Sequence, residues 1–416
     1  MRMKKFAPTL VAVAVAAVLA GCQSQAMKSE KSAMPAKEKA PAAKMAMKSM
    51  APPALAPLGE APIPPDNKLT DAKVELGKLL FFDPRVGGDA STGCSTCHEP
   101  DQGWAWAEDF SRGYPGTVHW RNSQSIINSA YFPRQFWAGS ASSNEKQAKA
   151  AAKGGVAGNG EDDIMEARLA LIPEYRQRFK DVFGTEWPLI DDVWHAISAF
   201  ERTMNTTGEY EVPLDKYLKG DKAALSEEQL RGMAIFNGKG GCINCHNGDL
   251  TTDLDYHNIG VPANKRWEED GLAQITFRFE QYAKGQTEEG YRTAKSDWGF
   301  YYRSKNKWDR GKFRTAPLRY IAYTAPYMHN GVFYTLEEVV DFYDRGGFDE
   351  EGRTTNFPEN KSPLIKPLGL TDQEKEDLIA FLEAFSGPEI TMEKPEQPPY
   401  APLFTLADLK AAQEAK

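Results

Sequence analysis

The sequence predicts an all-α fold made of two helical units of the same kind. The folded part contains several amphipathic stretches with helical spacing, and no stretch shows a strong strand signal. The pentapeptide Cys-x-x-Cys-His occurs twice, at residues 94–98 and 242–246, and each copy follows a predicted helix. Because the order of helix and motif is repeated, we expect two related domains, at residues 67–210 and 211–390.

The first predicted unit begins near Asn67 with a helix. Thr70 is a suitable N-cap, apolar residues follow at nearly helical spacing, and the Asp-Pro pair at 83–84 ends the pattern just before the first pentapeptide. Further along, the stretches 161–183 and 188–204 have the apolar periodicity of amphipathic helices. This unit is therefore predicted to consist of helices around the first motif.

The second predicted unit repeats this organisation. Ser226 and Gln229 form a capping-box pattern at the start of a helix that leads into the second pentapeptide. A later helix is expected to begin at Thr371 and to stop at the Gly-Pro pair 387–388. Residues 391–416 are rich in Pro and then polar, which predicts a C-terminal tail that either wraps around the fold or frays.

The N-terminal end has the pattern of a lipoprotein signal peptide over residues 1–22. A basic start precedes an apolar run, and the final LAGC resembles a bacterial lipobox, so we expect cleavage before Cys22 and a lipid anchor on its sulfur. A plain secretory signal with a chance cysteine is the alternative. Residues 23–66 are rich in Ala, Lys, Met and Pro without any aromatic residue, which predicts a disordered tether. The expected location is the bacterial cell envelope, periplasmic or surface side, with attachment to the outer membrane.

The charge balance argues against one class of partner. The chain has 50 Lys and Arg residues against 58 Asp and Glu residues, a net charge of -8. A general nucleic-acid binder would have a basic balance, so we expect no nucleic acid and contact with a membrane only through the lipid.

The use of cysteine indicates covalent haem. Apart from Cys22, the chain has four cysteines, all within the two pentapeptides: Cys94, Cys97, Cys242 and Cys245. Exported proteins usually use cysteines in disulfides, and none is left for that purpose here. Cys-x-x-Cys-His is the attachment signature of c-type haem, in which His98 and His246 would be the proximal iron ligands. A redox thiol motif or a four-cysteine zinc site is the alternative, but neither explains the two histidines.

Three longer motifs resemble those of a known family. ELGKLLFFDPR at 75–85, RNSQSIINSAYFPRQFWAGS at 121–140 and APLRYIAYTAPYMHNGVFYTLEEVV at 316–340 are similar to segments of the bacterial dihaem cytochrome c peroxidases and their methylamine-utilisation (MauG) relatives. The resemblance extends from about Leu69 to Gly387. It implies that the first haem meets hydrogen peroxide and that the second is its six-coordinate electron partner.

The ligand of the second haem departs from the peroxidase pattern. In the peroxidases a methionine lies fourteen residues after the histidine that corresponds to His329, and this chain has Tyr343 there. The resemblance therefore implies the branch in which tyrosine ligates the second iron. Residues 335–343 have the pattern of a helix with a capping box, and Tyr343 falls on its apolar face. A core tyrosine bonded to another group is the alternative.

The first haem is expected to keep an open coordination position. In many of the peroxidases a removable histidine lies a few residues before the asparagine that corresponds to Asn122, and this place falls near Tyr114. His119 lies nearby but out of register, so a contact with a propionate or the backbone is expected for it. Ligation of the first iron by His119 is the alternative.

Other roles are implied position by position. Trp137 matches the tryptophan that relays electrons between the haems, although a core tryptophan is the alternative. His329 is expected to lie near the haems without ligating them. A calcium ion between the haems would be held by oxygen donors, which suit this cation. The residues that match its site are Asn122, Thr324 and Pro326.

Two residues are candidates for the peroxide pocket. Gln147 matches a pocket glutamine ten residues after the relay tryptophan, whereas Ala157 stands where a glutamate is expected. Glu161 is the nearest carboxylate if the intervening loop carries an insertion, and it could then move protons as peroxide is cleaved. An acid that favours the start of a helix is the alternative for Glu161.

The resemblance implies a peroxide-dependent oxidoreductase. Peroxide would generate a high-valent state shared by both haems, and this state would oxidise a side chain of a partner protein, with tryptophan converted to kynurenine or a similar product. One alternative is an ordinary cytochrome c peroxidase supplied by a small electron-donor protein. The other is a non-catalytic dihaem electron carrier, which would need both irons saturated.

Overall fold

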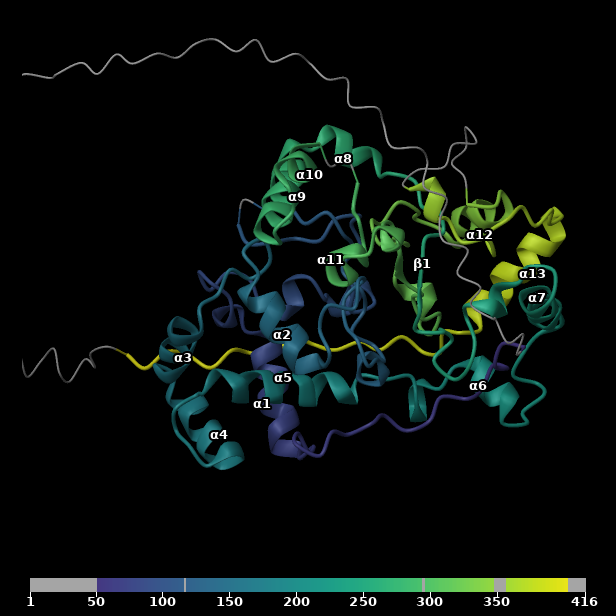
Figure 1. The fold of residues 1–416 in the computed structure, drawn as a ribbon. Helices are drawn as coiled ribbons and strands as arrows, with labels where there is room; N and C mark the ends of the chain where they lie inside the picture. The colour runs from purple at the N-terminus through teal and green to yellow at the C-terminus, as the bar shows by residue number, and fades with distance from the viewer. Residues whose placement is uncertain (1–50, 116, 294–295, 348–356, 403–416) are drawn as a thin grey trace, which may run out of the picture. The chain divides into compact units, whose positions relative to one another are not determined.

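The computed structural model describes residues 51–115, 117–293, 296–347 and 357–402 (Figure 1). Its regular elements are mainly helices. In the first half they are α1 (Asp71–Phe82), α2 (Asn144–Lys153), α3 (Asp162–Ala170), α4 (Pro173–Phe183), α5 (Ile190–Thr203) and α6 (Pro213–Leu218). In the second half they are α7 (Glu227–Asn237), α8 (Lys265–Glu269), α9 (Gly271–Ala283), α10 (Glu288–Thr293), α11 (Tyr301–Ser304), α12 (Leu336–Asp344) and α13 (Asp372–Glu383). Two short antiparallel strands, β1 (Tyr256–His257) and β2 (Phe313–Arg314), pair with Tyr256 opposite Arg314. The all-α fold class is confirmed.

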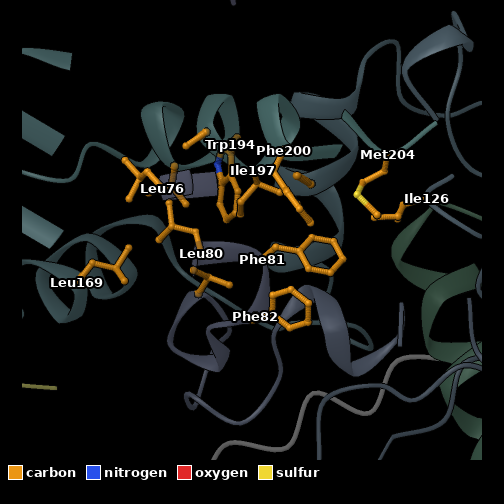
Figure 2. Packing of buried hydrophobic residues seen from close by; sticks show 14 of the residues in the cluster. Leu76, Leu80, Phe81, Phe82, Ile126, Leu169, Trp194, Ile197, Phe200 and Met204 are labelled. Carbon is orange, nitrogen blue, oxygen red and sulfur yellow. The ribbon is translucent and has the colours of Figure 1, made fainter. Parts of the chain in front are cut away.

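A helix crossing forms the centre of the first core. The apolar face of α1, with Leu76, Leu80 and Phe81, packs against Trp194 and Phe200 of α5 (Figure 2). The two backbones approach closely at a glycine in α1. A Cβ atom built on residue 77 would lie 1.8 Å from the carbonyl oxygen of residue 196, so only glycine fits there.

The second core contains the same kind of close helix crossing at a glycine. Helix α7 crosses α13, and Phe236 of α7 packs against Phe381 and Phe385. A Cβ atom on Gly232 would lie 1.9 Å from the carbonyl oxygen of Asp377. Each unit thus has a helix before its pentapeptide that crosses a later helix at a glycine, and this crossing fixes where each motif begins.

The predicted helix starts are confirmed where a capping side chain defines them. The side chains of Thr70, Ser226, Thr335 and Thr371 accept the expected backbone hydrogen bonds, and the last three form capping boxes. The stretch 161–183 forms two helices, α3 and α4, because proline lacks an N–H group and Pro173 begins a new helix. Helix α13 ends at Glu383, before the Gly-Pro pair. Helices α2, α6 and α8 to α11 were not predicted from the sequence.

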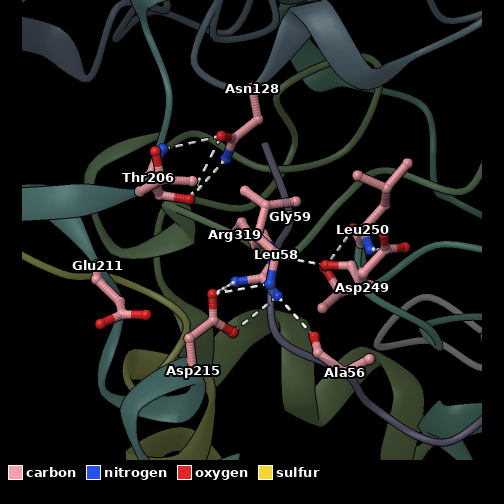
Figure 3. A network of polar contacts seen from close by, with 12 residues as sticks. Ala56, Leu58, Gly59, Asn128, Thr206, Glu211, Asp215, Asp249, Leu250 and Arg319 are labelled. Atoms are coloured by element: carbon pink, nitrogen blue, oxygen red, sulfur yellow. Dashed lines mark hydrogen bonds and ion pairs between the residues drawn. The ribbon is translucent and has the colours of Figure 1, made fainter. Parts of the chain in front are cut away.

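The predicted tether is too long at its C-terminal end. Residues 51–66 pack on the second unit, where Leu58 is only 5% exposed. The backbone N–H of Leu58 donates to Asp215 Oδ2 at 3.1 Å, and Arg319 Nη2 donates to the carbonyl of Ala56 at 3.0 Å (Figure 3). Arg319 and Asp215 form a buried ion pair of 2.8 Å, so both ions also bind this segment. The signal peptide, Cys22 and residues 23–50 lie outside the described residues.

The described part of the C-terminal tail wraps around the first unit. Arg85 Nη2 donates to the carbonyl of Pro398 at 2.8 Å, and the Tyr175 hydroxyl donates to Gln397 Oε1 at 3.2 Å. The N–H of Ala401 donates to the carbonyl of Leu171 at 3.1 Å. The tail therefore runs from the second predicted unit to the surface of the first predicted unit.

Candidate functional site

The two pentapeptides adopt the same local structure. Each forms a 3-10 turn, at Cys94–Thr96 and at Cys242–Asn244. The N–H of His98 donates to the carbonyl of Cys94 at 3.1 Å, and that of His246 donates to Cys242 at 2.8 Å. All four cysteines are free of disulfides. The tight turn keeps two thiols and one imidazole on a single short segment, as attachment of one porphyrin requires.

Both histidines are oriented by their own backbone surroundings. The Nδ1 atom of His98 lies 3.3 Å from the carbonyl oxygen of Trp104, and that of His246 lies 3.2 Å from the carbonyl oxygen of Thr251. An imidazole that donates its Nδ1–H to a carbonyl keeps the Nε2 lone pair for a metal. Burial lowers the pKa of His98 to about 4 and also lowers the pKa of His246, so both rings are neutral at physiological pH. These are the properties of an iron ligand.

A cavity of about 280 Å³ adjoins the second pentapeptide. Cys242, Cys245 and His246 line it, and so does Tyr343 from α12. Burial, together with the nearby Cys245 and Cys242, raises the pKa of the Tyr343 phenol. The phenol would therefore ionise only by coordinating a strong Lewis acid such as ferric iron.

The same cavity contains a buried cation that fits an anionic cofactor. Arg314 lines the cavity, and its Nη1 donates to the carbonyl of Arg134, while its Nε atom is buried without a hydrogen-bond partner. Burial lowers the pKa of Arg314 to about 10, and no salt bridge with a carboxylate is found for it among the described residues. A haem propionate would supply the missing anion. The residues around the cavity thus fit a c-type haem.

The structure brings most of the predicted site residues together. Trp137, His329, Asn122, Thr324 and Pro326 all line the large cavity. The Trp137 Nε1–H donates to the carbonyl of Asn122 at 2.9 Å, and the N–H of Asn122 donates to the carbonyl of His329 at 2.9 Å. The His329 ring lies 6.4 Å from the Trp137 ring. The relay and calcium roles stay predictions, but the residues are positioned as one group.

The two candidates for the peroxide pocket are not part of this group. Gln147 lies in the middle of α2 and is partly buried, and Glu161 is the exposed N-cap residue of α3. Neither residue lines the large cavity. The position of Glu161 matches the alternative of an acid at a helix start, so its catalytic role stays a prediction.

His119 has the backbone contact that was expected for it. Its Nδ1 atom accepts a hydrogen bond from the N–H of Arg121 at 3.0 Å, and its ring stacks on Trp120 at 4.1 Å. Burial and the charges of Arg121 and Lys284 lower its pKa to about 3. The ring is therefore neutral and fixed from one side.

Sequence reasoning missed four buried ionisable groups near the site. No sequence pattern pointed to Arg314. The ion pair between Arg121 and Asp297 could not be read from the sequence either, because the two residues are 176 positions apart. Glu201 could have been found, because it falls on the apolar face of the periodic stretch that became α5. Its carboxyl group accepts a hydrogen bond from Asn144, and Glu201 is one of the causes that raise the pKa of the Cys94 thiol.

The fold and the paired haem motifs define the class of dihaem c-type cytochromes. The family model described as "Di-haem cytochrome c peroxidase" matches residues 71–223. The chain is 52% identical over 355 residues to the cytochrome-c peroxidase IdrP1 of Denitromonas iodatirespirans, which covers 85% of this chain and 92% of the relative. It is 31% identical to the methylamine utilization protein MauG of Methylorubrum extorquens, with coverage of 81% and 84%. The solved structure of a MauG-like protein associated with microbial copper homeostasis superposes with a TM-score of 0.67 at 29% identity, covering 79% of this chain and 93% of that one.

The chain therefore belongs to the di-haem cytochrome c peroxidase family, which includes MauG. It is a haem oxidoreductase with two c-type haems, and hydrogen peroxide is the oxidant of the family. Members of the family are typically periplasmic. Over the residues described above, no helix combines the length and the apolar character needed to cross a bilayer.

Proposed function

We propose that this enzyme uses hydrogen peroxide at its first haem to oxidise a tryptophan side chain of a partner protein, to kynurenine or a similar product. The observation that carries the proposal is the position of Tyr343, on the wall of the cavity that also contains Cys242, Cys245 and His246. When bound, the two haems would supply the redox chemistry: they would give two electrons to hydrogen peroxide and keep two oxidising equivalents for the substrate.

The roles of the protein groups follow from their chemistry. His98 and His246 present a neutral Nε2 to iron, and Tyr343 supplies an anionic oxygen that favours higher oxidation states more than a thioether does. Trp137 relays electrons, and Arg314 compensates a propionate. Asn122, Thr324 and Pro326 are the proposed calcium donors. Cys22 is the proposed lipid anchor.

A second candidate is an ordinary cytochrome c peroxidase, which removes peroxide with electrons from a small donor protein. The name of the relative at 52% identity, cytochrome-c peroxidase, favours it. The two functions share the first haem and differ in the second, so the second haem is the place to separate them.

The test replaces only the ligand atom. Tyr343→Phe should remove the low-spin electron paramagnetic resonance signal of the second haem and open that iron to added ligands, while peroxide consumption with small donors persists. Tyr343→Met should raise the potential of the second haem. Tyr327→Phe is the matched control, because Tyr327 lines the same cavity and its hydroxyl donates to the carbonyl of Ile321 at 3.2 Å.

Two results would contradict the proposal. An unchanged low-spin signal in Tyr343→Phe would make Tyr343 a core residue. Rapid oxidation of a reduced c-type cytochrome by the wild-type enzyme, equally rapid in Tyr343→Met, would establish the ordinary peroxidase.

A further inference from the structure

Trp120 is a buried tryptophan with an unusual partner. Trp120 is 5% exposed, and its indole Nε1–H donates a hydrogen bond to Asp297 Oδ2 at 3.0 Å. Arg121 Nη2 donates to the other oxygen, Oδ1, at 2.9 Å. Burial alone would raise the pKa of Asp297, but the adjacent Arg121 overrides this effect and holds the pKa at about 2. The indole therefore faces a carboxylate that is ionised at all physiological pH values.

A short path leads inward from Trp120. The backbone of Arg121 joins it to Asn122, whose carbonyl accepts the hydrogen bond of 2.9 Å from Trp137 Nε1. Trp120 also lines a small cavity of about 40 Å³ that shares two wall residues, Asp297 and His329, with the large cavity. The two tryptophans are thus separated by two residues of backbone and one hydrogen bond.

A second path leads outward from Trp120. Its ring contacts Phe277 of α9 at 5.2 Å, and Phe277 contacts Trp267 of α8 at 4.9 Å. Helix α9 is a single layer between Trp120 and solvent, because its outer face carries large apolar side chains that are 40% to 64% exposed. These residues are Leu272, Ile275, Phe279 and Tyr282.

We propose that Trp120 is a second electron-relay residue, which passes single electrons from the surface at α9 to Trp137. The inference rests on the proposed function, in which peroxide supplies the oxidising equivalents. Trp120 gives one electron inward and regains one from the tryptophan side chain of the partner protein at the surface, and two such cycles accompany the reduction of one peroxide, with two protons, to two waters.

The surroundings of the indole suit this role. The Nε1 proton stays on the indole during each cycle, because Asp297 is a weak base while Arg121 binds it. A positive charge on the ring is then stabilised by the carboxylate that the ring already contacts. Lys284 lies 5.4 Å over the ring and opposes this effect, but its charge is offset by its ion pair with Glu280.

The experiment compares three variants of the holoenzyme. Trp120→Phe removes the redox-active ring, Trp120→Tyr restores a ring that can be oxidised, and Trp187→Phe is the matched control. Trp187 also donates its Nε1–H to a carboxylate, Glu166 at 2.9 Å, but it is exposed. Each protein is mixed with one equivalent of peroxide and frozen for electron paramagnetic resonance, with indole-deuterated tryptophan to identify the radical. The rate of oxidation of a reduced c-type cytochrome, used as the probe, is measured in parallel.

Trp120→Phe should lose a tryptophan radical signal and slow oxidation of the cytochrome by about tenfold or more, a change in barrier of about 1.4 kcal/mol. Trp120→Tyr should recover much of the rate, and Trp187→Phe should match the wild type. Equal losses in the Phe and Tyr variants would show that Trp120 acts only in packing, and an unchanged radical and rate in Trp120→Phe would also overturn the relay. The low-spin signal of the second haem and peroxide consumption with ascorbate, recorded on the same samples, report on the proposed function independently of Trp120.

Discussion

At the scale of single residues, the neighbouring side chains of Glu201 and Glu145 have pKa values that are shifted in opposite directions. Glu201 is 4% exposed, and burial raises its pKa to about 8. Glu145 is also partly buried, but a hydrogen bond from Asn67 and the charge of Arg202 outweigh the effect of burial and lower its pKa. Both side chains come from the α2 and α5 region of the first core, so the pair offers an internal control.

We predict that Glu201→Gln removes a pH dependence of stability. The folded pKa of Glu201, about 8, is above the unfolded value of about 4.3. Its contribution is therefore fully present below about pH 4 and is lost as the pH rises toward 8. The variant should match the wild type near pH 4 and exceed its unfolding free energy by at least about 1 kcal/mol at pH 8. Guanidinium titrations at both pH values measure this.

The control for this prediction is Glu145→Gln. The folded pKa of Glu145 is lowered, so its contribution is present above the unfolded pKa and is lost as the pH falls. This variant should be less stable than the wild type at pH 8. The same sign of change in both variants would contradict the assignment of opposite pKa shifts.

At the scale of elements, the start of α12 determines where Tyr343 lies. The Thr335 hydroxyl accepts from the N–H of Glu338 at 3.2 Å, and Glu338 Oε2 accepts from the N–H of Thr335 at 3.2 Å. Val340 anchors the helix in the second core, and Tyr343 follows almost one turn later, at the cavity. A local hydrogen-bond pattern thus fixes the phase of the helix that carries the proposed ligand.

We predict that Thr335→Ala weakens both the fold and the ligation. Loss of the cap should cost about 1 kcal/mol of unfolding free energy and broaden the low-spin signal of the second haem. Ser226→Ala, which removes the equivalent capping box of α7, should cost a similar amount and leave that signal unchanged. If both variants broadened the signal alike, the effect would come from general loosening and not from α12.

At the scale of the whole molecule, the C-terminal tail packs against the part of the chain around the first haem motif. The tail accepts hydrogen bonds from the side chains of Arg85 and Tyr175. Both side chains also donate hydrogen bonds to Asp83, which is fully buried. The carbonyl of Ile390, the residue just before the tail, accepts a hydrogen bond of 2.6 Å from Trp104 Nε1. The carbonyl of Trp104 is in turn the partner of His98. The second predicted unit therefore ends on a residue that helps to position His98, the proposed iron ligand of the first haem.

We predict that a stop after Ile390 destabilises the first unit selectively. Removal of residues 391–416 deletes the hydrogen bonds that Pro398 and Gln397 accept and the one that Ala401 donates, each worth about 1 kcal/mol. Unfolding followed at the first haem should shift to lower guanidinium concentration than unfolding followed at the second. A stop after residue 402 keeps these contacts and serves as the control. Equal shifts at both haems would show that the two units unfold together.

The sequence by itself determined the features that depend on neighbours in the chain. Capping side chains at Thr70, Ser226 and Thr335 define helix starts because their hydrogen bonds span only three residues. The pentapeptides define haem attachment because their turn is closed within five residues. The fixed interval of fourteen residues between His329 and Tyr343 is also a local property, so the proposed ligand could be named before its cavity was known.

Only the tertiary structure decided which distant groups meet. Arg319 binds Asp215 and Ala56, the first 104 and the second 263 positions away, and thereby orders a segment whose composition alone predicts disorder. Asp297 meets Trp120 and Arg121 across some 176 positions, and this contact carries the proposed relay. Such pairs leave no periodic or local pattern in the sequence. A buried charge is costly unless it is paired, and the partner is decided by which groups the fold brings together, not by their spacing along the chain.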